Sequence, residues 1–389
     1  MPDATTRSQP IGPSSGRRPT DTAQTPPAAH TRISLSGPAD IVAAIPYLLG
    51  HEPAASLVGI GLRHGGRLGV VTRIDVPDEG LITDPSWAIA DRLVAALLTD
   101  GDQSVVLALY DGADPPDPLG HAAAAVLAAV ERAALADGIE IVDLLHIGPS
   151  RWRSLKCLGE TCCPAEGLEL AEARSRPVAV DFVVRGRSPA PDRMGLEPVL
   201  AKAPANARRS ARTAAMRWRR GAGAAAGAAG RRRLLAEWVA IVDGYQRAGE
   251  LPSASRTGRL AAGWTDDMKL RDACMVAVLP SAHLVPEALV AGGVGDLEPV
   301  LRDASCAGAV VRVAPVLRTM ATYLSGADLA AVLALHAWLA WVSGAGAAAN
   351  DLLARCLAVA PGHRLAVLVA QLLDRAVPPD WAGSGVSEQ

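Results

Sequence analysis

Residues 56–76 read SLVGIGLRHGGRLGVVTRIDV, and this stretch decides what kind of sheet the chain can form. Two runs rich in Leu, Val and Ile flank the tripeptide His64-Gly65-Gly66. Glycines between two apolar runs are typical of a hairpin turn, so we expect antiparallel strands over 56–62 and 67–76. Such a hairpin argues against an all-parallel sheet.

Strands and helices alternate along the residues on either side of this hairpin. The further segments expected to be strands are 104–110, 139–147, 151–155 and 177–187. The segments expected to be helices are 39–49, 87–98 and 119–136. The alternation predicts a mixed α+β and α/β fold, in which helices pack on an N-terminal mixed β-sheet.

From about residue 236 the periodic segments are typical of helices, which predicts a C-terminal all-helical domain. Its last part predicts helices over 329–341, 347–359 and 364–376, with a glycine-containing turn after the first and Pro361 after the second. This helix–turn–helix–Pro spacing resembles a tetratricopeptide repeat. Plain helical packing is the alternative interpretation of the same hairpin.

Composition divides the chain into five predicted segments. Residues 1–31 are rich in Pro, Ser, Thr and Arg, and residues 198–236 hold ten basic side chains and no acid around a run of Gly and Ala. The predicted segments are a disordered tail at 1–31, a mixed α/β domain with a Cys cluster at 32–200, a basic Arg/Ala/Gly linker at 201–235, a helical domain at 236–379 and a disordered tail at 380–389.

Charge and motif content exclude several classes of function. The net charge of −2 gives no global attraction to nucleic acid or membranes, and no stretch is apolar enough to predict a membrane span. We find no secretory signal, and six cysteines in such a chain favour a reducing, cytoplasmic location. The sequence also lacks a P-loop, a dinucleotide fingerprint, an HExxH motif and an EF-hand loop.

Three cysteines form the only local concentration of reactive side chains, in the sequence Cys157-Leu158-Gly159-Glu160-Thr161-Cys162-Cys163-Pro164. Cys157, Cys162 and Cys163 are candidate zinc ligands, but a structural zinc site normally has four ligands. The fourth could be His146, Cys274, Cys306 or a residue of a second subunit. Two alternatives stay open: a disulfide or redox pair, and a turn whose cysteines pack as small apolar residues.

A basic helix is expected over 205–220, inside the predicted linker. Arg209, Arg212 and Arg219 share one face of it and could contact phosphates of a nucleic acid. The aromatic residues needed for base stacking are nearly absent, and a solvated helix that pairs with the acidic remainder of the chain explains the pattern as well. Nucleic-acid binding therefore ranks low among the predicted partners.

Several segments together resemble an uncharacterised actinobacterial family, the domain of unknown function 4192. The segments that carry the resemblance are 35–40, 46–53 with 56–58, 73–75, 151–157, 162–167 and 337–341. The piece Cys162-Cys163-Pro164-Ala165-Glu166-Gly167 is the most specific of them. The resemblance spans about residues 32–379 and implies no known activity, substrate or cofactor.

These patterns support three functional hypotheses of different classes. The leading one is a non-enzymatic interaction or regulatory protein that docks a protein partner on its C-terminal helices. The alternative is an enzyme or sensor built on the Cys cluster, with zinc as the candidate cofactor. The weaker alternative is nucleic-acid binding through the basic segment.

Overall fold

The structure is a computed structural model that describes residues 35–64, 67–77, 86–100, 103–184, 187–192, 198, 200–221, 227–306, 309–375 and 377–380. The predicted tail at 1–31 and, apart from Asp380, the predicted tail at 380–389 lie outside the described residues. The same holds for Gly65 and Gly66 of the expected hairpin turn and for residues 222–226 of the Gly/Ala run.

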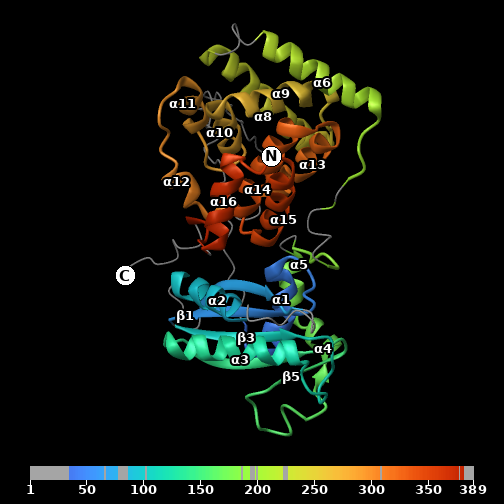
Figure 1. The fold of residues 1–389 in the computed structure, drawn as a ribbon, viewed down its shortest axis with the longest axis vertical. Helices are drawn as coiled ribbons and strands as arrows, with labels where there is room; N and C mark the ends of the chain where they lie inside the picture. The colour runs from blue at the N-terminus through green and yellow to red at the C-terminus, as the bar shows by residue number, and fades with distance from the viewer. Residues whose placement is uncertain are drawn as a thin grey trace, which may run out of the picture. The chain divides into compact units, whose positions relative to one another are not determined.

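A six-stranded mixed sheet forms the centre of the N-terminal part (Figure 1). Its strands are β1 (Ser56–Arg63), β2 (Arg67–Asp75), β3 (Ser104–Tyr110), β4 (Glu140–Ile147), β5 (Arg151–Ser154) and β6 (Leu168–Glu169). They lie in the order β2-β1-β3-β4-β5-β6. The β3–β4 pair is parallel and the other neighbouring pairs are antiparallel, which confirms the predicted mixed sheet.

Helices cover both faces of this sheet because side chains alternate along each strand. Leu57, Leu107 and Leu109 share one core with α2 (Ser86–Asp100) and α3 (His121–Ala136). Val58 and Val106, one position along, share a second core with α1 (Pro38–Leu49) and α4 (Leu170–Arg174). Helix α3 also makes the crossover between the parallel strands β3 and β4.

The strand expected over 177–187 is wrong, because residues Pro177–Val184 form helix α5. The segment is apolar at consecutive positions, so its periodicity does not separate a strand from a buried helix. In the structure Val178, Ala179 and Phe182 are buried, at the spacing of one helix face. The Phe182 ring stacks on Tyr47 of α1 with ring centroids 5.1 Å apart.

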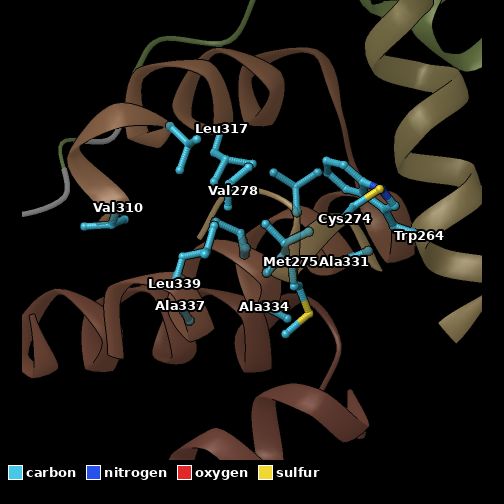
Figure 2. Close-up of a cluster of buried hydrophobic side chains, with 14 of the residues drawn as sticks. Trp264, Cys274, Met275, Val278, Val310, Leu317, Ala331, Ala334, Ala337 and Leu339 are labelled. Carbon is cyan, nitrogen blue, oxygen red and sulfur yellow. The ribbon is translucent and has the colours of Figure 1, made fainter. Parts of the chain in front are cut away.

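The C-terminal part consists of helices that share one large hydrophobic core. They are α6 (Ala205–Arg220), α8 (Ala228–Ala248), α9 (Ala254–Asp266), α10 (Met268–Val276), α11 (Val285–Ala291), α12 (Glu298–Leu301), α13 (Ala314–Tyr323), α14 (Gly326–Val342), α15 (Gly346–Val359) and α16 (Arg364–Asp374). Figure 2 shows Trp264 of α9 with Cys274 and Met275 of α10 in this core. Helix α14 is buried nearly all round, as expected for a helix at the centre of an all-helical layer.

Helix α6 packs closely on α9 through a glycine. A Cβ atom built on Gly258 of α9 would lie 1.9 Å from the carbonyl oxygen of Ala211, which belongs to α6. Both Ala211 and Ala215 of α6 are buried in this contact region. The helix expected inside the basic segment is therefore confirmed, and its small residues face the helical core.

Replacing Gly258 by alanine is expected to destabilise the helical part, because the new methyl group meets backbone that cannot rotate away. We expect a loss of about 1–3 kcal/mol in the free energy of unfolding, measured by urea denaturation. Gly244→Ala in α8 is the matched control, since the nearest atom to its Cβ would lie 3.6 Å away. That control is expected to gain up to about 1 kcal/mol from helix propensity. Equal effects of the two substitutions would contradict this account of the contact.

Candidate thiol site

The Cys cluster lies in the excursion between two short antiparallel strands, β5 and β6. Strand β5 pairs with β4 on one side and with β6 on the other, through Trp152 and Leu168. Arginine side chains of β5 hold the returning chain: Arg151 donates to the Gly167 carbonyl at 2.9 Å and Arg153 to the Ala165 carbonyl at 3.1 Å. The sheet therefore fixes both ends of the loop that carries the thiols.

Ser154, the last residue of β5, anchors the start of this loop. Its buried hydroxyl donates to Asp143 of β4 at 2.5 Å. The same oxygen accepts the backbone N–H of Cys157 at 3.0 Å and that of Lys156 at 3.2 Å. Through Ser154, the backbone of Cys157 is thus hydrogen-bonded to the edge of the sheet, which fixes the position from which its side chain extends.

The structure brings the three sulfur atoms of Cys157, Cys162 and Cys163 within 4.8 Å of one another. The Sγ atoms of Cys157 and Cys162 lie 3.2 Å apart. A backbone bond from Cys163 N–H to the Gly159 carbonyl, at 2.8 Å, closes the turn that returns Cys162 and Cys163 toward Cys157. The chain spacing C-x4-C-C therefore becomes a compact trio of thiols.

Gly159 allows this close approach because it has no side chain. A Cβ atom at this position would lie 2.8 Å from Cys162 Sγ and 3.8 Å from Cys157 Sγ. The Cys162 sulfur therefore occupies space that a side chain at position 159 would need, while the Cys157 sulfur would be in ordinary contact with it. The glycine two positions after Cys157 is the sequence signal for this arrangement, and the spacing of the cysteines alone does not reveal it.

The thiols of the cluster differ in acidity. The backbone N–H of Gly159 donates to the Cys157 sulfur, and together with the thiols of Cys162 and Cys163 it lowers the pKa of Cys157 below its ordinary value of 9.0. Burial, with the neighbouring Cys157, raises the pKa of Cys163 to about 11. The thiol of Cys157 is therefore expected to ionise at lower pH than the thiol of Cys163.

The remaining cysteines of the chain lie in the helical core and behave as apolar residues. Burial raises the pKa of Cys274 to about 12 and the pKa values of Cys306 and Cys356 to about 11. These three side chains are fully buried, whereas Cys162 is exposed and Cys157 is half-buried. The structure therefore does not bring Cys274 or Cys306 to the cluster as a fourth ligand.

His146, the other candidate fourth ligand, is engaged elsewhere. Its Nε2 atom lies 2.9 Å from Asp111 Oδ1, and both side chains are buried, at 2% and 3% exposure. Asp111 directly follows β3 and His146 lies near the end of the parallel strand β4, so the pair joins the carboxyl ends of these strands. Over the described part of the chain, the group of close metal-ligating atoms contains the three cysteines and no histidine.

The three arginines predicted to contact nucleic acid divide into two groups. Arg209 and Arg212 are exposed on α6. Arg219 instead donates to Asp328 at 2.5 Å and to Asp266 at 2.9 Å, and these carboxylates raise its pKa. One of the three predicted phosphate contacts is therefore already paired with acidic residues of α9 and α14.

Alkylation offers a direct test of the order of acidity within the cluster. Because the thiolate is the nucleophile, Cys157 is expected to react with iodoacetamide faster than Cys163 near neutral pH. Its rate should rise with a midpoint below pH 9.0, the ordinary pKa of a cysteine, because a lowered pKa makes the thiolate at lower pH. The measurement is peptide mapping by mass spectrometry of reduced protein treated with a chelator. Faster labelling of Cys163 would contradict the assignment.

Comparison with known proteins identifies a family and nothing finer. A family model with the description "Domain of unknown function (DUF4192)" matches residues 38–380, nearly the whole chain. No curated protein and no solved structure matches the chain. Among the described residues, no helix is long and apolar enough to cross a membrane.

Proposed function

The chain belongs to the family described as Domain of unknown function (DUF4192), and within it we propose that the loop with Cys157, Cys162 and Cys163 binds a soft metal ion. Zinc is the first candidate, because thiolates are among its preferred ligands. The observation that carries the proposal is the convergence of three thiols within 4.8 Å, one of them with a lowered pKa.

The geometry and the charges of the trio fit a cation. A tetrahedral zinc ion with Zn–S bonds of about 2.3 Å holds its sulfurs about 3.8 Å apart. The sulfurs of the cluster are separated by 3.2 Å at one pair and by at most 4.8 Å at the others. Three thiolates this close repel one another, so only a bound cation makes full deprotonation favourable.

Three protein ligands leave one position of a tetrahedral ion for water or for a ligand from outside. Structural zinc sites are closed by four protein ligands, whereas sites with chemistry keep one position open. The loop is on the surface, with Cys162 exposed, so a solute reaches this position without passing through the core. The proposed role is therefore that of a sensor or an open metal site, and the metal is not needed to hold the fold together.

A reversible disulfide between Cys157 and Cys162 is the second candidate, and the 3.2 Å separation of their sulfurs favours it. Two thiols would form one S–S bond of about 2.05 Å, with two protons released and two electrons passed to an oxidant such as a peroxide. The Cys157 thiolate, favoured by its lowered pKa, would attack hydrogen peroxide, breaking the O–O bond to give a sulfenic acid and water. The Cys162 thiol would then attack the Cys157 sulfur, forming the S–S bond and releasing a second water.

A thiol-protection experiment separates the two candidates. Zinc added to reduced, metal-free protein should protect all three cluster thiols from a thiol reagent, and a chelator should restore their reactivity. Under the second candidate, zinc should protect none of them. Hydrogen peroxide should then remove two thiols, which a dithiol reductant returns. Failure of both treatments to change the reactivity would overturn the proposed thiol site in either form.

Two other hypotheses from the sequence, protein docking on the helical part and nucleic-acid binding through the basic segment, remain predictions. The helix–turn–helix–Pro spacing of α14 and α15 supports a tetratricopeptide-like hairpin and a protein-docking role for the helical part. The exposed Arg209 and Arg212 support a weaker role in binding nucleic acid. The predicted domain boundaries, actinobacterial origin and cytoplasmic location rest on sequence composition and cysteine usage.

A further inference from the structure

A cavity of about 280 Å³ lies in the helical part, between α13, α14 and α15. The segment before α6 closes it on one side through Pro198, Leu200 and Lys202. Two bonds attach this segment to the end of α13: Ala203 N–H to the Thr322 carbonyl at 3.2 Å, and Lys202 Nζ to the Leu324 carbonyl at 3.4 Å. The cavity therefore has a wall built by a distant part of the sequence.

The floor of the cavity is apolar. Leu317, Val332, Leu333 and Leu352 line it, and each is at most 3% exposed because the same side chains belong to the helical core. These residues come from three helices, so no single helix could form the floor. An apolar tail placed here would contact the core in the way that a buried side chain does.

Three side chains of the cavity wall are cationic, Lys202, Arg318 and Arg355. The other polar side chains that line it are Thr322 and His336, and no acidic side chain does so over the described part of the chain. Arg355 also forms an ion pair with Asp351, one turn earlier on α15, at 3.7 Å. The planar guanidinium group of arginine can donate two parallel hydrogen bonds to the two oxygens of a carboxylate, so arginine is common at sites that bind carboxylates.

We infer that this cavity binds a small amphiphilic carboxylate, with its alkyl tail on the leucine floor and its anionic group between the arginines. The cavity volume of about 280 Å³ lies just below the range of about 300–1,000 Å³ that is typical of small-molecule sites, so we expect a small ligand on the scale of a medium-chain fatty acid.

Octanoate is the probe. Octanol is the matched ligand that lacks the negative charge, and acetate is the matched ligand that lacks the alkyl tail. We expect saturable 1:1 binding of octanoate to the full chain by isothermal titration calorimetry, at least about tenfold tighter than either matched ligand. Equal binding of octanol would overturn the carboxylate assignment. Absence of saturable octanoate binding would overturn the site.

Two pairs of variants locate the binding. Ala358 is exposed and lines the mouth, so Ala358→Trp should block binding, whereas Ala354→Trp, one turn earlier on the same exposed side of α15, should not. Arg318→Gln and Arg355→Gln should each weaken octanoate binding about tenfold. Arg364→Gln on α16 lies outside the cavity and should leave it unchanged.

The result of these substitutions does not depend on whether the thiol site binds a metal, because the cavity contains none of the cluster cysteines. Unchanged circular dichroism and thermal unfolding would establish that Ala358→Trp is folded, and octanoate binding as in the parent chain would then contradict the location. If that variant unfolds, the two arginine substitutions decide the question, because each changes a side chain at the cavity wall. Octanoate binding that survives both of them would contradict the role of the arginines.

Discussion

Replacing Cys162 by serine is expected to abolish zinc binding while leaving the fold intact. The Cys162 side chain is exposed, so its sulfur contributes no core packing. A serine hydroxyl does not ionise near neutral pH, and the ion would keep only Cys157 and Cys163. Loss of a residue behind the ligands already costs about 10–100-fold in metal affinity, so loss of a ligand should cost at least about 100-fold.

Competition with a chromophoric chelator measures this loss on the full chain. Leu158→Ala is the matched control, since Leu158 lies in the same loop, is 95% exposed and offers no ligand atom. The control should bind zinc as the parent chain does. An affinity of Cys162→Ser within about threefold of the control would show that Cys162 is not a ligand.

Replacing Trp238 by alanine is expected to be among the most destabilising single changes in the helical part. Trp238 is fully buried and meets Trp264 edge-on, with ring centroids 5.1 Å apart. Its indole N–H donates to the carbonyl of Cys274 at 2.9 Å, in the last turn of α10, where helix carbonyls lack partners within the helix. We expect a loss of about 3–5 kcal/mol in the free energy of unfolding.

A second substitution separates packing from hydrogen bonding at this position. Trp238→Phe keeps most of the ring packing but removes the N–H donor, so it should reduce the free energy of unfolding by less than Trp238→Ala does. The buried carbonyl of Cys274 that is left without a donor should account for about 1–3 kcal/mol of that reduction. Val239→Ala, on the exposed side of the same helix, should change stability by no more than about 0.5 kcal/mol. Urea denaturation of the three variants gives the comparison. A loss below about 1 kcal/mol for Trp238→Ala would contradict the assigned core.

Local sequence patterns were sufficient for most elements of the fold. The apolar run Ser104–Tyr110 is β3 with the expected bounds, and the segments at 347–359 and 364–376 match α15 and α16 closely. Failures occur where tertiary pairing decides. Strand β6 has two residues and exists only because it pairs with β5, and the apolar segment of α5 carries no period of its own.

The candidate site was predictable in its residues but not in its arrangement. The spacing of Cys157, Cys162 and Cys163 indicated a cluster, which the structure shows. The N–H of Gly159 that lowers the pKa of Cys157, and the bond from Ser154 to Asp143, depend on how the loop returns to the sheet. Local sequence patterns do not predict the cavity of the helical part, because its walls come from four separate segments of the chain.

Elemental analysis of the full chain, purified under reducing conditions, tests the proposed metal site most directly when it is combined with a thiol count before and after denaturation. We predict about one zinc ion per chain, with the cluster thiols unreactive in the native protein. All six thiols should react after denaturation with a chelator. No bound metal, together with three cluster thiols that stay reactive in the native protein when zinc is added, would contradict the account.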